Sequence, residues 1–252
     1  MGLGKTRQAL AVADYYKSDW PLLIVTSASL KNFWQTQIID LLPRVPLYNI
    51  RLLETHNDSI FDAHVVICSY SAMENNMKKL RQKDFGVMIF DESHNIKNSK
   101  AKQTINATNL AEKTRRVILI TGTPALSRPA ELFPQLAIID GRFASYHQFT
   151  IRYCQGHNGS FGWVATGSSN LEELNLILRK NFMIRRTKDD VYSELGDKKR
   201  EVVELKVVKG ESKEMKKFAE NYKRFEGKKR DQKEVLINWF SETAKLKADA
   251  VW

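Results

Sequence analysis

Cysteine is scarce in this chain of 252 residues, and the two that occur, Cys68 and Cys154, form no Cys-x-x-Cys pair. The five histidines show no metal-ligand spacing either. These absences argue against a structural zinc site and against a secreted scaffold held by disulfides, so we expect a reducing compartment. No run approaches the roughly 20 apolar residues of a membrane-spanning helix. No signal peptide precedes the first motif, and we therefore expect no membrane partner.

Acidic residues are outnumbered: 29 Asp and Glu stand against 40 Lys and Arg, which gives a formal net charge of +11. Most of the excess lies between Arg179 and Lys233, where nineteen Lys and Arg accompany eleven Asp and Glu. Such a basic block favours a polyanionic partner such as nucleic acid, and a solvated helical surface is the alternative. The hydrophobic fraction of 42% is ordinary, and a chain of this length can form one large domain with an appendage.

The chain is organised around one short apolar stretch, Gly86–Phe90, which is followed by Asp91-Glu92-Ser93-His94. An uncharged run that ends in Ile and Phe predicts a buried strand of a parallel sheet. Asp91 and Glu92 would then lie at its carboxyl end, where α/β sheets bind ligands. One carboxylate can hold Mg²⁺ through its waters, and the next can activate a water for attack on a phosphate. A strand that merely ends in a polar turn would show the same residues.

A second motif stands at the start of the chain, where Gly2-Leu3-Gly4-Lys5-Thr6 forms the latter half of the phosphate-binding pattern G-x-x-x-x-G-K-[ST]. In that pattern glycine lets backbone amides approach the phosphates, Lys5 reaches the β and γ oxygens, and Thr6 ligates Mg²⁺. The helix that follows points its amino end at the anion. The first glycine of the pattern and the strand that feeds it do not precede it, so we expect a fragment.

Strands and helices alternate along the first half of the chain. Apolar runs at Leu22–Val25, His64–Cys68 and Val117–Ile120 predict further buried strands, and this alternation predicts an α/β fold with a doubly wound parallel sheet. One helix before the first strand is expected to pack through Ala9, Val12, Ala13 and Tyr16. Two helices between strands are expected to pack through Leu30, Phe33, Trp34, Ile38 and Leu41, and through Ala101, Ile105 and Thr108, the second of these beginning at Asn98 or Ser99. We expect Trp34 to belong to the core rather than to a stacking platform.

Hydroxyl side chains follow two of these strands. Ser27 and Ser29, together with Lys31, stand where they could bind the phosphates of a nucleic-acid backbone, and a plain helix cap is the competing interpretation. The sequence Thr121–Pro124 follows the last strand. In a nucleotide-binding sheet its hydroxyls would lie beside the acidic strand and could sense the γ-phosphate or its metal, whereas elsewhere such residues form only a turn.

The second half of the chain is less regular. Residues 140–170 are rich in Gly, Ser and aromatic residues with little periodicity, so we expect an inserted loop region. Asn170 and Glu173 predict a capping box that opens a helix. The buried face of that helix is expected to be Leu171, Leu174, Ile177 and Leu178. Beyond it, alternation over Arg200–Val207 predicts a half-exposed strand, and apolar residues spaced over Met215–Tyr222 predict an amphipathic helix.

Several motifs follow one another along the chain in a fixed order: Gly2–Thr6, Leu23–Val25 with Ser29, Leu30 and Trp34, Asp91–His94, Leu119–Pro124 with Glu131 and Leu132, and Arg185–Lys188 with Val191. This ordered set resembles the first motor lobe of the Swi/Snf-related DNA translocases in helicase superfamily two. Within that family the chain is most similar to the annealing-helicase branch, the SMARCA-like and zinc-finger Ran-binding enzymes. The residues that favour this branch are Asp91–His94, Thr123–Leu132, Arg152–Cys154 and Gly167–Leu171.

The resemblance implies a role for each motif. A RecA-like lobe at residues 1–140, truncated at its start, would bind ATP and Mg²⁺. Its cofactor-binding residues would be Gly2, Leu3, Gly4, Lys5 and Thr6, its catalytic residues Lys5, Asp91 and Glu92, and its Mg²⁺ ligands Thr6 and Asp91. Thr121, Gly122 and Thr123 would link hydrolysis to DNA movement. The positions that track the phosphates of one DNA strand in the family are matched by Ser27, Ser29, Lys31, Ser69 and Tyr70.

Residues 141–252 would then be a family-specific loop region and a basic helical extension that leads to a second motor lobe. Two functions stay open. The parent protein is expected to be a nuclear, DNA-dependent ATPase that moves on or rewinds DNA and contacts phosphates rather than bases. Alternatively, the chain is a binding module that holds ATP and DNA with little or no turnover, because the second lobe is missing. A small P-loop kinase fits less well, since no acceptor site or lid is recognisable.

Overall fold

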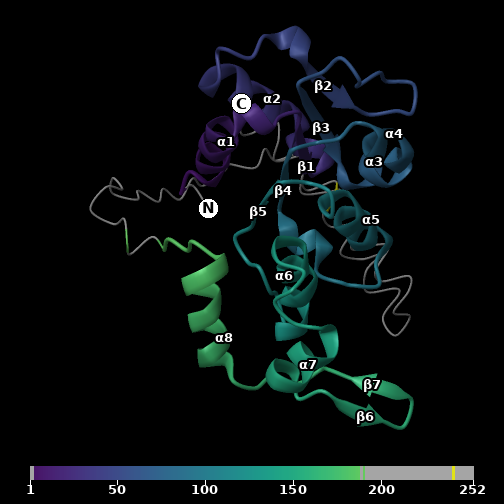
Figure 1. Cartoon of the computed structure of the whole chain (residues 1–252), viewed down its shortest axis with the longest axis vertical. Coiled ribbons are helices and arrows are strands. Elements are labelled where there is room, and N and C mark those ends of the chain that lie inside the picture. The colour runs from purple at the N-terminus through teal and green to yellow at the C-terminus, as the bar shows by residue number, and fades with distance from the viewer. Residues whose placement is uncertain (1–2, 188–189, 191–239, 242–252) are drawn as a thin grey trace, which may run out of the picture. The chain divides into compact units, whose positions relative to one another are not determined.

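Five short strands form one parallel sheet in the described part of the computed structural model (Figure 1). The strands are β1 (Leu22–Thr26), β2 (Ile50–Leu53), β3 (Val65–Ser69), β4 (Val87–Asp91) and β5 (Arg116–Ile120), in the spatial order β2-β3-β1-β4-β5. β1, β3 and β4 are buried along their whole length, because both faces of the sheet are covered. The predicted α/β fold with a doubly wound parallel sheet is confirmed.

The structure describes residues 3–187, Asp190 and residues 240–241. The chain divides into two units, Met1–Tyr192 and Ser193–Trp252, and nearly everything described belongs to the first. The strand predicted at Arg200–Val207, the helix predicted over Met215–Tyr222 and most of the basic extension lie outside the described residues. No described helix is long and apolar enough to cross a membrane.

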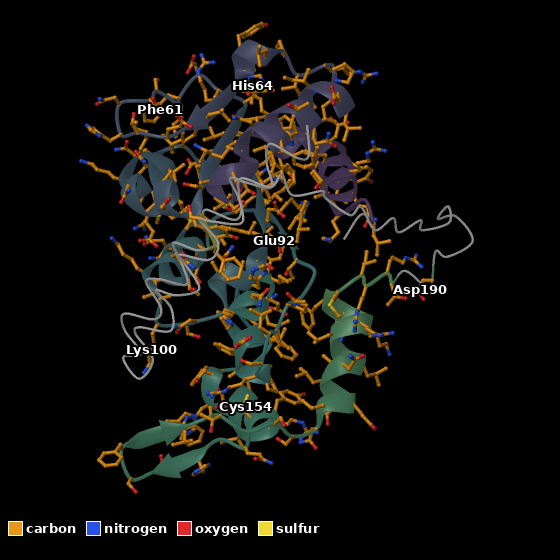
Figure 2. The ribbon with its side chains drawn as sticks, turned by 180° about the vertical axis from the view of Figure 1, so that it is seen from behind. Phe61, His64, Glu92, Lys100, Cys154 and Asp190 are labelled. Carbon is orange, nitrogen blue, oxygen red and sulfur yellow. The ribbon has the colours of Figure 1, made fainter. Side chains whose placement is uncertain are left out.

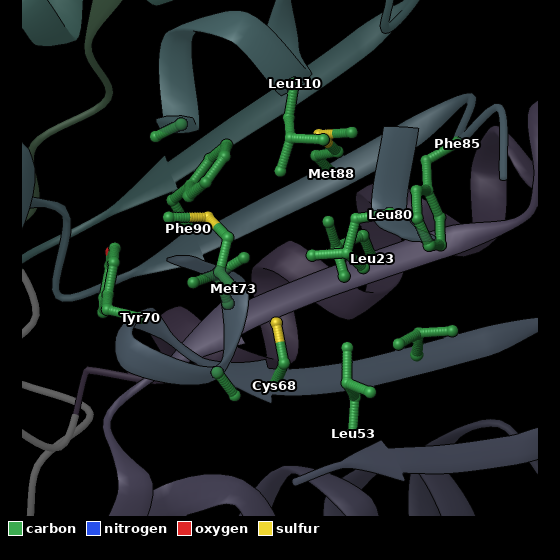
Figure 3. Packing of buried hydrophobic residues seen from close by; sticks show 14 of the residues in the cluster. Leu23, Leu53, Cys68, Tyr70, Met73, Leu80, Phe85, Met88, Phe90 and Leu110 are labelled. Atoms are coloured by element: carbon green, nitrogen blue, oxygen red, sulfur yellow. The ribbon is translucent and has the colours of Figure 1, made fainter. Parts of the chain in front are cut away.

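Two hydrophobic clusters lie on opposite faces of the sheet, because successive side chains of each strand point to alternate faces. On one face, α1 (Lys5–Tyr15) and α2 (Lys31–Leu41) cover residues such as Leu22 and Ile24. On the other, α3 (Tyr70–Asn75), α4 (Met77–Gln82) and α5 (Lys102–Ala111) cover residues such as Leu23 and Phe90. Figure 3 shows this second packing, with Leu23, Met88 and Phe90 of the strands against Met73, Leu80 and Leu110 of the helices.

The register of the strands brings their carboxyl ends into one row. Thr26 of β1 pairs with Ser69 of β3, and Asp91 of β4 pairs with Ile120 of β5. Val25 and Phe90 pair one position earlier, so Thr26 stands level with Asp91. The acidic turn, the Thr121–Pro124 loop and the loops after β1 and β3 therefore start from the same edge of the sheet.

The helices pack through faces that differ in part from those predicted. In α1 the buried residues are Ala9, Leu10 and Ala13, whereas Val12 is 46% exposed. Ala9 and Ala13 belong both to a helix face that includes Leu10 and to one that includes Val12. The periodicity alone does not show which of these two faces is buried. The expectation for Val12 was therefore wrong, and Leu10 takes its place.

The same kind of difference occurs in α2 and α5. In α2 Trp34 and Ile38 are buried as expected, but Phe33 is 47% exposed. The α5 helix begins at Lys102 rather than at 98 or 99, and its Ile105 is 48% exposed. Its buried face consists of Thr104, Ala107, Leu110 and Ala111. Small residues dominate that buried face, so a prediction based on large apolar side chains selects the wrong face of α5.

The stretch 140–170 is structured, and the prediction of an inserted loop was wrong. It contains α7 (Tyr146–Cys154) and a hairpin of β6 (His157–Gly159) and β7 (Gly162–Val164). A capping box between Ser145 and Gln148 opens α7. The hairpin is fixed to α7 by Trp163, whose indole stacks on His147 and whose Nε1 donates to Thr150 Oγ1 at 3.0 Å.

The helix predicted after Asn170 exists as α8 (Leu171–Ile177), but its predicted capping box does not form. Asn170 lies in the left-handed region at φ 48°, and its Nδ2 donates to the backbone carbonyl of Arg152. Glu173 instead accepts hydrogen bonds from Arg152 Nε at 2.7 Å and from the Tyr153 hydroxyl at 2.8 Å. Tertiary partners in α7 therefore replace the local cap. Leu174 and Leu178 are buried as predicted, whereas Leu171 is 52% exposed.

A third hydrophobic cluster joins the end of the sheet domain to the following helices. It contains Leu132 and Leu136 around the start of α6 (Phe133–Ile139), Phe149 and Tyr153 of α7, and Leu174 of α8. The predicted domain boundary after residue 140 falls inside this cluster and inside the first unit. The division of function between residues 1–140 and 141–252 stays a prediction.

Candidate functional site

The amino end of α1 lies at the same edge of the sheet as the acidic turn. At the other end of the helix, the guanidinium of Arg116 at the start of β5 lies 4.4 Å over the ring of Tyr16. Asp19, which follows, pairs with Arg115 at 2.9 Å. The helix and the strand each span roughly 16 Å. Ala9 and Leu10 of α1 lie in one hydrophobic cluster with Ile120 at the end of β5, so we infer that the two elements run in opposite directions. Gly4 and the first turn of α1 therefore stand near the residues that follow Ile120.

The loop before α1 has the features of an anion cradle. Gly4 adopts φ 72°, and a Cβ added there would meet nothing within 4 Å. No side chain caps the first amides of α1, and within the described residues no hydrogen bond or ion pair involves the Lys5 or Thr6 side chain. Leu3 is half-buried, and Gly2 lies outside the described residues. Free amides, a free ammonium and a free hydroxyl at one helix end suit a phosphate group.

Asp91 is held by donors from three elements. Its Oδ2 accepts the Thr26 hydroxyl at 2.9 Å and the Trp34 indole Nε1 at 2.8 Å. Its Oδ1 accepts the backbone amide of Glu92 at 3.0 Å. The residue is only 8% exposed, so these bonds replace water around the buried carboxylate. Because Oδ2 is doubly occupied, Oδ1 is the oxygen with more freedom to receive a further ligand.

Tyr70 supports the same residue from the backbone side. Its hydroxyl donates to the Asp91 carbonyl at 2.7 Å. Burial, followed by the neighbouring charge of Asp91, raises the pKa of Tyr70 far above its usual value of 10.0. The hydroxyl therefore stays protonated and remains a donor at any physiological pH.

Glu92 is connected to the Thr121–Pro124 loop through one histidine. Glu92 adopts a left-handed conformation at φ 48°, which directs the chain away from the strand. Its Oε2 lies 3.1 Å from His94 Nδ1, and the same nitrogen lies 3.2 Å from the Thr121 hydroxyl. The Thr121 hydroxyl in turn accepts the amide of Thr123 at 3.1 Å. Of the predicted coupling residues, Thr121 is thus in contact with the acidic turn, Thr123 is bound to Thr121, and Gly122 is exposed.

The residues predicted to track DNA phosphates lie in two different settings. Ser29 is exposed, its hydroxyl lies 3.3 Å from that of half-buried Ser27, and Lys31 pairs with Glu54. Ser69 and Tyr70 are instead buried, at 7% exposure each.

In the buried pair, the hydroxyls have partners within the lobe. Ser69 Oγ accepts the Ala72 amide as the cap of α3, and the Tyr70 hydroxyl is bound to Asp91. The DNA assignment stays a prediction for all five residues, and the first loop is the more accessible part of it.

Besides the bond from the Tyr70 hydroxyl, four contacts to the acidic turn have no counterpart in the sequence predictions. Thr26 and Trp34 hold Asp91, His94 joins Glu92 to Thr121, and Gln135 accepts the Ser93 hydroxyl at 2.8 Å. For the contact of Thr26 with Asp91, the only signal in the sequence is that Thr26 stands at the end of an apolar run. The other three depend on contacts between residues distant in sequence.

Among the described residues there is no group of three or more His, Cys, Asp and Glu side chains that could hold a metal ion. Mg²⁺ that arrives with a nucleotide needs fewer protein ligands, because phosphate oxygens and waters complete its shell. The Thr6 hydroxyl and Asp91 Oδ1 are the oxygens at this edge that suit that requirement.

Residues 1–249 match the SNF2-related domain. The chain belongs to this family. Over its whole length it is 48% identical to the SWI/SNF-related matrix-associated actin-dependent regulator of chromatin subfamily A-like protein 1 of Drosophila melanogaster, of which it covers 34%. It is 34% identical, again over its whole length, to the DNA annealing helicase and endonuclease ZRANB3 of Bos taurus, of which it covers 25%. This SNF2-related chain thus spans about a third or less of these relatives.

A solved structure supports the fold of the SNF2-related chain. The SWI2/SNF2 ATPase core of Sulfolobus solfataricus in complex with dsDNA matches with a TM-score of 0.65 at 22% identity, over 98% of this chain and 52% of that one. At this identity the likeness shows the RecA-like fold alone. The resemblance to Swi/Snf-related proteins that the motifs indicated is confirmed by the family match and by the two relatives.

Proposed function

We propose that this chain is the ATP-binding first lobe of an ATP-dependent DNA translocase of the annealing-helicase type. The observation that supports it most is the meeting of two motifs at one sheet edge. We infer from the packing of α1 on β5 that the free amino end of α1 with Lys5 lies near the end of β5. Asp91 ends the adjoining β4, and Glu92 follows it directly. Phosphate-binding amides and paired carboxylates at one edge suit the hydrolysis of a nucleoside triphosphate.

Each residue of the site has one part in this proposal. The amides at Gly4 and the ammonium of Lys5 bind the phosphates, and Thr6 and Asp91 hold Mg²⁺. ATP supplies the phosphoanhydride bond whose hydrolysis drives movement. Glu92 orients and deprotonates the attacking water, and its link through His94 passes the state of the site to Thr121. Thr26 and Trp34 keep the Asp91 carboxylate in place.

The proposed polymer is DNA. Relatives of this chain are named as a regulator of chromatin and as a DNA annealing helicase, which supports a DNA partner and a place in the nucleus. The net charge of +11 supports a polyanionic partner as well. We propose that contacts are made to the phosphate backbone, in part through the loop with Ser27, Ser29 and Lys31, so that binding falls steeply with salt. A second motor lobe would close over the ATP.

The alternative function is a binding module, and it concerns the isolated chain. A second lobe that supplies an arginine to the transition state is worth roughly 10³ to 10⁵ in rate. The 252 residues alone would then bind ATP and DNA with little turnover. The coverage of only 34% of the Drosophila relative favours this outcome for the chain by itself.

The experiment measures ATP binding and ATP turnover, with and without duplex DNA. It compares the 252-residue chain with a protein that carries this chain and the second lobe. We expect both to bind ATP and only the longer protein to show DNA-stimulated turnover. Lys5→Ala should abolish binding in both, while Lys17→Ala, two residues beyond the end of α1, should not. Binding that survives Lys5→Ala would contradict the proposed site.

A further inference from the structure

Gln135 of α6 contacts the acidic turn and the Thr121–Pro124 loop with the two ends of one side chain. Its Oε1 accepts the hydroxyl of Ser93, the residue directly after Glu92, at 2.8 Å. Its Nε2 donates to the carbonyl of Pro124 at 2.6 Å and to that of Glu131 at 3.1 Å. No other described residue makes hydrogen bonds from one side chain to both segments, apart from His94 with its contacts to Glu92 and Thr121.

The contact is buried and chemically specific. Ser93 is fully buried and Gln135 is 5% exposed, so neither group can exchange its partner for water. The acidic turn offers a hydroxyl donor, whereas the loop offers a carbonyl acceptor. The side-chain amide of glutamine provides both an acceptor and a donor, and glutamate, leucine or methionine at this position would lose at least one of the two bonds.

The loop is fixed to the same helix region on its far side. Glu131 accepts the backbone amides of Leu126 and Ser127 at 2.7 and 3.2 Å, and the Ser127 hydroxyl at 2.7 Å. Burial alone would raise the pKa of Glu131, but the hydrogen bonds of Ser127 and Leu126 lower it below its usual value of 4.5. Residues 124–127 are thus hydrogen-bonded to the segment that begins α6, and Gln135 connects this segment to the acidic turn.

The helix α6 also begins the third hydrophobic cluster. Leu136, the next residue after Gln135, packs in that cluster with Phe149 of α7 and Leu174 of α8. Figure 2 shows Glu92 between the part of the lobe that carries Phe61 and His64 and the part that carries Cys154 of α7. Gln135 therefore connects the acidic turn to the loop and to the helices beyond it.

We infer that Ser93 and Gln135 form a positioning pair that transmits nucleotide binding from the acidic turn to the Thr121–Pro124 loop and α6. This inference rests on the proposed function and adds a second connection beside that of His94. Gln135 touches no reacting atom in it. Gln135 acts on the position of the Thr121–Pro124 loop. A variant without its amide should therefore still bind the nucleotide, but the loop should no longer change when the nucleotide binds.

Amide hydrogen exchange on the 252-residue chain tests the pair, with a non-hydrolysable ATP analogue and Mg²⁺ as the probe. In the unmodified chain the probe should slow exchange both in the peptide that contains residues 91–95 and in the peptide that contains residues 121–128. In Gln135→Met, which keeps the size of the side chain, the first effect should remain and the second should fall at least fivefold. The affinity for the probe should stay within twofold.

Two further variants complete the test. Gln148→Met makes the same substitution at an amide whose hydrogen bonds stay within the first turn of α7, and it should preserve both effects. Ser93→Ala combined with Gln135→Met should show no greater loss than either alone, because the two residues act as one unit. If Gln135→Met transmits the effect as well as Gln148→Met does, the pair is structural only and the inference fails. If the probe changes exchange nowhere in the unmodified chain, the proposed nucleotide site fails and the inference with it.

Discussion

The indole nitrogen of Trp34 lies 2.8 Å from Oδ2 of Asp91, although 57 positions separate the two residues in sequence. Trp34 is fully buried, and the Thr26 hydroxyl donates to the same oxygen. The tryptophan thus has two roles, since it packs in the cluster under α2 and also orients the carboxylate that we propose as an Mg²⁺ ligand.

Trp34→Phe removes this donor and keeps most of the packing. Hydrogen bonds to a charged group contribute about 1.5–3 kcal/mol, so we expect a loss of stability of that order in urea unfolding. We also expect the Mg²⁺ concentration that half-saturates ATP binding to rise severalfold, because the carboxylate is less well oriented. Trp20→Phe is the matched control, since its indole donates to the backbone carbonyl of Ala13 at 2.8 Å. An unchanged Mg²⁺ dependence in Trp34→Phe would limit Trp34 to packing.

Leu10→Ala and Val12→Ala test which face of α1 carries the stability of the lobe. Leu10 is fully buried, and its truncation should cost about 2–5 kcal/mol in the free energy of unfolding. Val12 is 46% exposed, and its truncation should cost less than about 1 kcal/mol. Chemical unfolding of both variants at one pH gives the comparison. Equal losses would show that α1 does not pack as described.

Asp58 gives the stability a dependence on pH. Its Oδ2 accepts the amides of Thr55 at 2.7 Å and Glu54 at 2.8 Å, and these bonds hold the pKa of Asp58 below its usual value of 3.8. The ionised carboxylate therefore stabilises the fold above the unfolded pKa, and this stabilisation is lost as the pH falls through the folded pKa.

In Asp58→Asn the side chain does not titrate. We expect the variant to be less stable than the unmodified chain near neutral pH, and this difference to shrink as the pH is lowered from about 4, where the unmodified chain loses its carboxylate. Unfolding midpoints across that range measure it. A difference that stays constant with pH would show that Asp58 is not a titrating cap.

The parts of the fold that depend on local pattern could be predicted from the sequence. β4 is an uncharged run, and the residues that end it follow directly, so Asp91 and Glu92 could be placed at a strand end. The edge strand β2 was not predicted, because Arg51 interrupts it and its middle residues are only half-buried. The helix and hairpin of residues 146–164 were missed because their aromatic residues show little periodicity and stand among Gly and Ser.

The contacts within the site could not be predicted in the same way. Trp34 with Asp91 and Ser93 with Gln135 join residues 57 and 42 positions apart, and neither pair has a spacing that a local pattern could show. The choice between Leu10 and Val12 also depended on where the sheet lies rather than on α1 itself. The residue types that do chemistry were therefore visible in the sequence, and the side chains that hold them were not.

We propose that Lys5 and Glu92 act on one ATP molecule, the first in binding and the second in catalysis. Glu92→Gln in a protein that carries both lobes separates these parts, with Glu74→Gln of α3 as the control. We measure ATP affinity and DNA-stimulated turnover on the same preparations. If Glu92 is the general base, Glu92→Gln should keep the ATP affinity within twofold of the unmodified protein and lower turnover by about 10²-fold or more. Full turnover in Glu92→Gln would contradict it.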